Sequence, residues 1–268
     1  MRPELIFDQF ATVRATNTTH RGGSVRFSFV NDILEQTTPL LENIDVDSVT
    51  IDSKALTVNM REYGTAVTNT ALLRGTSMIA MDPLIAERVG YNAGISTYDD
   101  GSTAAIATVG GAAEYLNGTL LRDGVAEMQK NNVRPMMGGA YVAVISPYQA
   151  QQLKSDASDT GWRYTVAYNE GAAGNSIFMG EIGMYEGVRI IVNNHLTSQG
   201  GGYLMGAEAL AKAFSTAPGF GPNPRTVVSP VVDKLKRFAS VGWYSLVGYS
   251  IFRAEALLHI ETAPTLKP

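Results

Sequence analysis

The sequence predicts an α+β protein in which long strands near both ends of the chain enclose a mixed middle region. Between residues 24 and 70, apolar and polar residues alternate with the period of strands that have one buried face. An apolar run, Tyr141–Ile145, is followed by Ser146-Pro147, a pattern typical of a buried strand that leads into a helix. Residues 238–258 again predict long strands. If these last strands pair with elements near the first, residues 95–221 form a lobe inserted between two halves of one domain.

The alternating run predicts a long antiparallel hairpin. Its apolar residues begin with Val25, Phe27 and Phe29, and the turn-forming residues 52–54 predict the tip. A two-stranded ribbon is only marginally stable alone in water, so it must lie on its own domain or on another subunit. Its opposite face is charged, and the residues of that face are Glu35, Glu42, Asp45, Asp47, Asp52, Lys54, Arg61 and Glu62.

Helical patterns follow the hairpin. Residues 71–93 carry apolar residues at helical spacings, but Gly75 and Pro83 predict a break inside them. Asp82-Pro83 suits an N-cap and first helical position, so the firmer helix is expected from Pro83 to Asn92, with Gly94 ending it. A second amphipathic helix is expected over residues 117–131, and it should pack on a sheet.

Three glycine-rich or proline-rich segments predict loops. Residues 171–187 are expected to be largely loop, with a strand at 188–192 after them. Gly200, Gly201 and Gly202 predict a flexible crossing into residues 203–214. The run of prolines and glycines over residues 218–224 predicts the clearest linker of the chain.

Composition excludes several functions. The 268 residues are 45% hydrophobic and 17% charged, which is typical of a folded globular protein. A net charge of −4 gives no basic field that would attract phosphate groups, so specific nucleic-acid binding has no electrostatic support. The absence of cysteine excludes disulfides and thiolate chemistry. No stretch approaches the roughly 20 apolar residues of a membrane span, so we expect no membrane partner.

Patterns for enzymatic or metal chemistry are weak. His20, His195 and His259 are far apart in sequence and do not predict a metal site. The chain has no Gly-x-Ser-x-Gly elbow of a serine hydrolase, and the glycine-rich segment at 200–206 is not followed by the Gly-Lys-Ser/Thr of a phosphate loop. The spacing of the aspartates in the hairpin also misses the calcium-loop pattern. We therefore expect no catalytic residue, no cofactor and no metal.

The chain from about Leu5 to Ala263 resembles the major capsid proteins of tailed bacteriophages, of the type named after phage Hong Kong ninety-seven. Within that group it is most similar to the N-four-type major capsid family. The resemblance rests on the order and spacing of five segments: 7–11 (FDQFA), 21–27 (RGGSVRF), 82–93 (DPLIAERVGYNA), 141–147 (YVAVISP) and 242–249 (GWYSLVGY).

The resemblance implies a division of the chain. Residues 1–23 would be an N-terminal arm and residues 24–63 an extended loop that lies across a neighbouring subunit. Residues 64–94 and 222–268 would form a peripheral domain with a spine helix and a long sheet. Residues 95–221 would form an axial domain. Many relatives carry a long N-terminal scaffolding segment removed on maturation, whereas this chain starts almost at the arm, which implies a separate scaffold protein or no such step.

The expected function is that of a non-enzymatic major capsid protein that assembles as hexamers and pentamers into an icosahedral head around double-stranded DNA, without sequence-specific binding. Its first partner would be itself, with scaffold, portal and decoration proteins as further partners. The expected location is the virion, after assembly in the host bacterial cytoplasm. The expected site is a subunit interface on the extended loop, formed by Arg26, Glu35, Glu42, Lys54 and Arg61.

Two alternative functions follow from the same residues. A shell of the same fold could be an encapsulin-like cellular compartment, which would hold an enzyme in place of a genome. A soluble α/β enzyme or a carbohydrate-binding module would stay monomeric or small. Lys54, at the expected hairpin tip, also suits the covalent lysine–asparagine cross-link of some phage shells of this fold, or else a solubilising turn lysine.

Overall fold

The computed structural model describes residues 7–16, 22–30, 48–51, 53–77, 81–96, 107–136, 139–156, 181–196, 198–229 and 237–267, together with residues 37, 39 and 42. Its helical elements are η1 (Phe7–Gln9), α1 (Ala71–Thr76), α2 (Met81–Ser96), α3 (Gly118–Lys130), α4 (Pro147–Lys154) and η3 (Ala254–Ala256). Its strands are β1 (Ala11–Ala15), β2 (Ser24–Val30), β3 (Ser53–Asn59), β4 (Arg61–Thr70), β5 (Ala107–Gly110), β6 (Tyr141–Ile145), β7 (Glu181–Tyr185), β8 (Val188–Val192), β9 (Gly201–Met205), β10 (Leu210–Phe214), β11 (Arg225–Ser229), β12 (Phe238–Ile251) and β13 (Leu257–Glu261).

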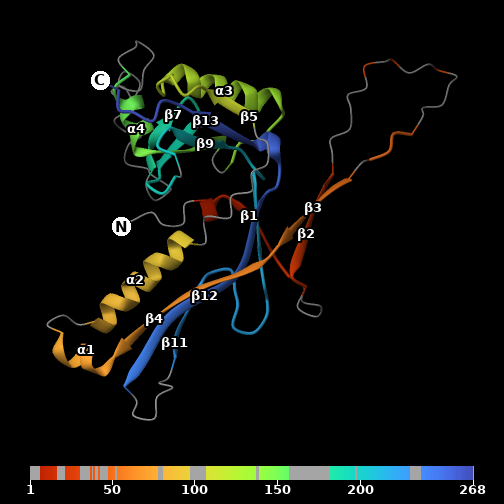
Figure 1. Ribbon diagram of the computed structural model, residues 1–268. Coiled ribbons are helices and arrows are strands. Elements are labelled where there is room, and N and C mark those ends of the chain that lie inside the picture. Colours follow the sequence, from red (N-terminus) through yellow and green to blue (C-terminus); the bar gives the residue numbers. More distant parts are fainter. Residues whose placement is uncertain are drawn as a thin grey trace.

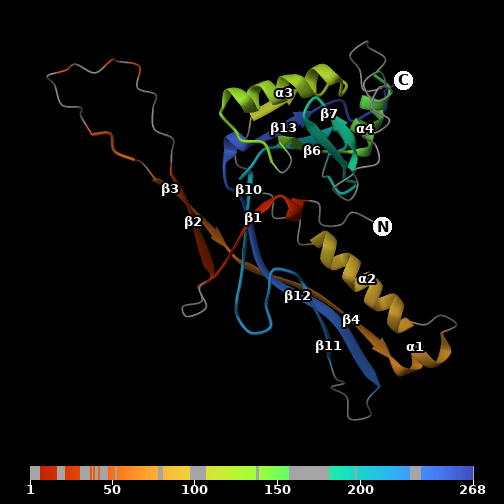
Figure 2. The ribbon, with the colours of Figure 1, turned by 180° about the vertical axis from the view of Figure 1, so that it is seen from behind.

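The five-stranded sheet is built around β12, the longest strand. β4 pairs antiparallel with one edge of β12 over ten residues, from Phe238 to Val247. The other edge is shared by β11 and β10, and β1 pairs parallel with the outer edge of β10. The helix α2 lies along this sheet, where Trp243 packs with Val89 and Ala93 (Figure 2). The prediction that a late strand pairs with the segment after the hairpin is therefore correct.

The six-stranded sheet forms the second lobe, in the order β5-β13-β9-β6-β8-β7. All five residues of β6 are buried, and the largest core cluster forms around this strand and includes residues of α3 and α4. The predicted ends of the two helices are correct. Asn117 caps α3 by accepting a hydrogen bond from the Leu120 amide, and Ser146 opens α4 with a capping box completed by Gln149.

The predicted ribbon exists, but its turn differs from the prediction, and its base has the first of the two covers left open, its own domain. β2 and β3 pair antiparallel, with Val30 opposite Ser53 and Phe29 opposite Lys54. Residues 53 and 54 therefore lie in a strand, and the connection between the strands spans residues 31–52, most of which lie outside the described residues. The apolar face at the base of the ribbon is covered by its own chain, because Phe27 and Val58 are buried with Ala211, Ala213 and Phe252.

Two helix predictions needed adjustment. The expected break in residues 71–93 is present between α1 and α2, but Gly75 lies inside α1. Asp82 and Pro83 lie in the first turn of α2, which begins at Met81 and ends at Ser96, two residues after Gly94. Asp82 has a tertiary role as well, since its Oδ1 accepts a hydrogen bond from Asn69 Nδ2 at 2.8 Å.

Two of the three predicted loops were wrong in their described parts, and the third is a loop that does not separate domains. Residues 181–185 form β7, which joins β8 through a tight turn with Glu186 and Gly187 at positive φ. Gly201 and Gly202 are buried in β9, where a Cβ on Gly202 would lie 2.6 Å from Gln149 Oε1. The glycines here are needed because two segments of the chain approach each other closely, and they do not indicate flexibility. The segment 218–224 connects two strands of one sheet, so it does not separate domains.

Some strands belong to the other lobe from the one that the expected domain boundaries give them. β10, placed by sequence in the 95–221 lobe, belongs to the five-stranded sheet, whereas β13, near the C-terminus, belongs to the six-stranded sheet. β1, placed in the N-terminal arm, pairs with β10. The two sheets are therefore joined through shared segments, and a division by continuous residue ranges does not follow their strands.

Burial at the base of the ribbon gives a matched stability test. Val58→Ala should lower the free energy of unfolding by about 2 kcal/mol, because it removes two methyl groups from a closed core. Val58 is 2% exposed, whereas Val30, in the other strand of the ribbon, is 63% exposed. Val30→Ala makes the same change in strand propensity and should cost less than about 0.5 kcal/mol. Chemical denaturation of both variants measures the difference, and equal losses would contradict the assigned packing.

Candidate assembly surfaces

The ribbon continues beyond its buried base and leaves the body of the molecule. In Figure 1 β2 and β3 point away from both lobes. Val30, Val49 and Ile51, at the start and end of the connection between the strands, are between 62% and 67% exposed. In a single chain these valine and isoleucine side chains remain exposed to water. Another surface that packs on them would bury their apolar area, which is favourable.

The predicted interface residues fall in different places. Arg26 and Lys54 are exposed on β2 and β3, and Glu42 is exposed in the connection, while Glu35 lies outside the described residues. Arg61 is exposed too, but it belongs to β4, opposite Val247 of β12, and not to the extended loop. Lys54 is not at a tip, so the positional argument for a cross-link at this lysine no longer holds.

A second apolar surface lies at the far end of the five-stranded sheet, and we call it the outer apolar end. Val67 and Val228 flank Val241 on one face of the sheet, since all three are direct cross-strand partners. The main chain of Ala71 bonds to that of Arg237, which brings α1 beside the start of β12. Its members are Val67 (40% exposed), Leu72 (76%), Leu73 (41%), Val228 (67%) and Phe238 (40%).

Sequence reasoning missed the outer apolar end. Consecutive valines in β11 predict a strand buried on both faces, yet Val227 and Val228 are both exposed. The consecutive valines could have indicated this surface. A strand at a sheet edge with apolar residues on both faces needs a cover, and the described part of the chain does not supply one. A surface of this kind marks a contact with another molecule.

Charge is distributed unevenly between the ribbon and the rest of the chain. Residues 31–52 include six acidic side chains and no basic one, so the remaining residues, with 21 basic and 19 acidic side chains, are net positive. The segment 225–237, from β11 to the start of β12, has four basic side chains and one acidic. In both views β11, which opens this segment, lies at the end of the five-stranded sheet away from β2 and β3 (Figures 1 and 2).

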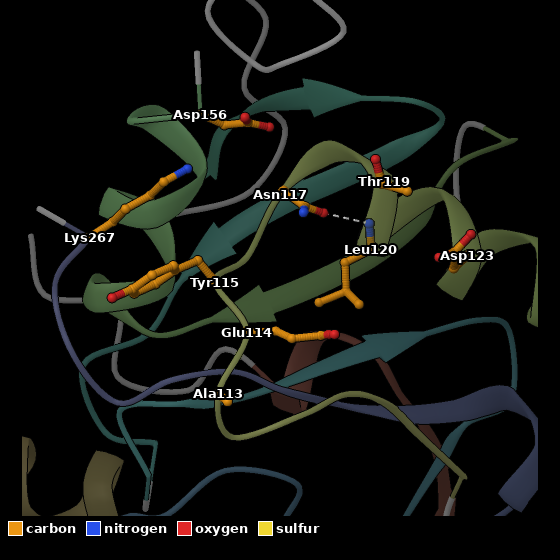
Figure 3. Close-up of a pocket in the computed structure, with 9 residues that line it drawn as sticks. All are labelled: Ala113, Glu114, Tyr115, Asn117, Thr119, Leu120, Asp123, Asp156 and Lys267. Carbon is orange, nitrogen blue, oxygen red and sulfur yellow. Dashed lines mark hydrogen bonds between the residues drawn. The ribbon is translucent and has the colours of Figure 1, made fainter. Parts of the chain in front are cut away.

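A depression lies beside the start of α3 (Figure 3). Its volume is about 420 Å³. Asn117 and Asp156 are occupied in helix capping, since they accept hydrogen bonds from the amides of Leu120 and Gly118 at 2.8 and 3.3 Å. Its lining residues are Ala113, Glu114, Tyr115, Asn117, Thr119, Leu120, Asp123, Asp156 and Lys267. This set has no histidine, cysteine or serine that could act as a nucleophile–base pair.

Titratable groups elsewhere also serve packing. Among the described residues, no group of histidine, aspartate and glutamate side chains could hold a metal ion. His195 lies beside Tyr91, and the His259 ring packs against the Tyr203 ring at an interplanar angle of 52°. Burial raises the pKa of Tyr141, whose hydroxyl donates to the Val133 carbonyl.

Two further pKa shifts come from specific partners. Hydrogen bonds to Glu186 and Tyr185 raise the pKa of Arg122, which fixes the β7–β8 turn to α3. Burial, with the neighbouring Asp8 carboxylate, raises the pKa of Tyr249 well above its usual range. No helix in the described part of the chain is long and apolar enough to cross a membrane.

Comparison with known structures places this fold among shell-forming proteins. The capsid of Ralstonia phage GP4 matches with a TM-score of 0.71 and 15% identity, over 100% of this chain and 94% of that one. The capsid of cyanophage P-SCSP1u matches with a TM-score of 0.69 and 15% identity, over 99% and 90%. The head of Helicobacter pylori bacteriophage KHP40 matches with a TM-score of 0.64 and 12% identity, over 99% and 92%.

The fold of this chain is the one found in these phage capsid structures. The model of the phage capsid protein family matches residues 119–257, just over half of the chain. The chain belongs to the phage capsid protein family, and it is a major capsid protein of a phage head, as its sequence predicted. No curated protein sequence matches it.

The outer apolar end predicts an assembly defect without a folding defect. Val228→Lys should change the free energy of unfolding by no more than about 0.5 kcal/mol, because the side chain is largely exposed. In an assembled contact the new charge would be desolvated, so the protein concentration needed for assembly should rise at least about tenfold. Ala126→Lys, at an exposed position of α3, is the charge-matched control. Light scattering against protein concentration measures both, and equal behaviour would remove the outer apolar end as a contact.

Proposed function

We propose that the chain assembles as hexamers and pentamers into an icosahedral head, with residues 31–52 of each copy lying on a neighbouring copy. The observation that carries this proposal is the projecting ribbon, whose base is fixed by the chain's own core and whose continuation exposes Val30, Val49 and Ile51. A closed shell needs several different contacts for each subunit, and a ribbon that reaches a neighbour supplies one of them.

Charge supports a contact between copies. Residues 31–52 are acidic and the segment 225–237 is basic. Contact of one copy's acidic segment with another copy's basic end would be a heterologous, head-to-tail contact, the type that generates rings when the rotation closes. Arg26, Glu35, Glu42, Lys54 and Arg61 would contribute to the surfaces around it.

The two lobes suit the peripheral and axial roles. The five-stranded sheet with α2 would form the peripheral part, and its outer apolar end would meet other capsomers. The six-stranded sheet with α3 and α4 would gather around the five-fold and six-fold axes. These assignments follow the sheets and not the residue boundaries 64–94, 95–221 and 222–268, because β10 and β13 cross those boundaries.

The proposed head encloses double-stranded DNA without reading its sequence. A chain with a net charge of −4 lacks the basic surface that would hold DNA tightly against the inner wall. The protein acts without catalysis, which agrees with the capping role of the polar groups in the depression beside α3. Scaffold, portal and decoration proteins are further proposed partners, and assembly takes place in the host cytoplasm.

Removal of the loop tests the proposal directly. Val30 and Ser53 face each other across the ribbon, so an Asn-Gly turn can join them in place of residues 31–52. The shortened chain should fold with the same unfolding transition as the full chain, because the removed residues lie beyond the buried base. Negative-stain microscopy and size exclusion should show hexamers, pentamers or shells for the full chain and only single subunits for the shortened one.

The outcomes separate the alternatives. Shells formed by the shortened chain would contradict the proposed loop contact. A full chain that stays monomeric at all concentrations would favour a soluble enzyme or a carbohydrate-binding module. Particles purified from cells that contain a protein cargo and no nucleic acid would favour an encapsulin-like compartment.

A further inference from the structure

Two described segments connect the lobes side by side, and we call the region around them the junction. The chain passes from β9 to β10 through residues 206–209 and from β12 to β13 through residues 252–256. These two crossings run side by side, because the Phe252 amide donates to the Ala209 carbonyl and the Gly206 amide to the Ala256 carbonyl. The chain also passes from one lobe to the other between α2 and β5, after residue 96 and before residue 107. Short, bonded segments between packed lobes are the type of place where such lobes reorient.

Residues 7–16 cross the same junction from one lobe to the other, and we call them the N-terminal strap. At its start, Phe10 is buried in the core of the six-stranded lobe and the Phe7 ring meets the Tyr203 ring of β9 edge-on at 5.9 Å. At its end, β1 pairs with β10 of the five-stranded sheet, and Thr16 Oγ1 accepts a hydrogen bond from the Thr216 amide at 3.0 Å. The strap is therefore attached to both lobes.

Asp8 of the strap is the counter-ion of a buried lysine at the junction. Asp8 Oδ1 lies 2.5 Å from Nζ of Lys212 in β10, whose side chain is 4% exposed. The same oxygen accepts a hydrogen bond from the Tyr249 hydroxyl of β12 at 3.1 Å. Lys212 Nζ also lies 5.7 Å from the centroid of the Tyr249 ring. No other carboxylate pairs with Lys212 in the part of the chain that the structure describes.

Because of this arrangement, we expect the strap to be either fully docked or fully detached, and not partly lifted. A buried ammonium group that loses its only carboxylate is strongly destabilised, because solvent does not replace the lost partner. Asp8 is the more exposed partner, at 20%, so it regains water when the strap lifts, whereas Lys212 must move to find water. α2 also reaches the six-stranded lobe, where Tyr91 Oη lies 3.5 Å from His195 Nε2, a long and therefore weak hydrogen bond.

We propose that the N-terminal strap is a detachable lock on the angle between the two lobes, with the Asp8–Lys212–Tyr249 cluster as its latch. While the strap is docked, the lobes form one rigid unit. When it lifts, the uncompensated Lys212 loosens β10 and β12 beside the crossings, and the lobes reorient. Such a lock would let one sequence fit several positions in a shell, but the device is a property of the single chain and does not depend on assembly.

Distances between the lobes test the lock. The chain has no cysteine, so Glu87→Cys in α2 and Ala126→Cys in α3 place one dye on each lobe, both at exposed positions. Single-molecule energy transfer at picomolar concentration keeps copies apart. The doubly labelled chain should give one narrow distribution. Asp8→Ala should add a second population or broaden the distribution, and Asp8→Ala with Lys212→Met should restore the narrow one, because no buried charge then lacks a partner.

The order of the variants distinguishes a latch from ordinary packing. Lys212→Met alone should be milder than Asp8→Ala, since Asp8 is partly solvated and a buried methionine needs no partner. If Asp8 only fills space, Asp8→Ala will be as damaging with Met at position 212 as with the native lysine, and the proposal fails. An unchanged distance distribution in Asp8→Ala also overturns it.

Hydrogen exchange of the unaltered chain provides a test that needs no variant. Amides of β1 should exchange at least about tenfold faster than those of β6, because the strap opens without unfolding the six-stranded core. Equal rates in β1 and β6 would mean that the strap leaves only when the whole chain unfolds, and the proposed lock would then be wrong.

Discussion

Backbone pairing along β12 is the constraint on which the rest of the structure depends. One edge of this strand carries β4, and through β4 it fixes the start of α1 and the position of the ribbon. Its other edge carries β11 and β10, and its C-terminal end leads into β13 of the second sheet. The close approach of chains here requires glycine: a Cβ on Gly248 would lie 2.3 Å from the Asn59 carbonyl oxygen, where β12 passes the end of β3. The positions of the ribbon, of α2 and of both lobes therefore all depend on this one strand.

Local signals in the sequence predicted those elements whose own residues decide their structure. The apolar run of β6, the helix start at Ser146-Pro147 and the amphipathic pattern of α3 are recognisable because each pattern lies within a few neighbouring residues. The alternation of Val25, Phe27 and Phe29 predicted a strand with one buried face for the same reason. The resemblance to phage capsid proteins added the arrangement of these elements, which no local pattern could supply.

The predictions that failed depend on what lies opposite each residue. Gly201 and Gly202 have a flexible composition, but Gln149 packs against them, and its side chain bonds to the Gly200 carbonyl and to Thr262. Lys54 has a turn composition, but Phe29 pairs with it across the ribbon. Arg61 appeared to continue the loop, but β12 captures it into the sheet. In each case a partner distant in sequence overrides a local preference, and a single sequence does not identify that partner.

The contrast between the base and the continuation of the ribbon explains how a thin element can serve as an assembly contact. A fully mobile loop would have to lose the conformational freedom of many residues when it meets a neighbour, and that loss would weaken the contact. Here the chain's own core already orders the base: Phe27 and Val58 are buried, and the Arg14 guanidinium stacks over the Phe27 ring at 5.2 Å. In the proposed assembly, the ordering cost would thus be met during folding, by residues that do not contact the neighbour. Val49 and Ile51, exposed farther along, would then be available to that neighbour. The hairpin is thus divided into a buried part and an exposed part. The buried part stabilises the single subunit, and the exposed part remains available for a contact between copies.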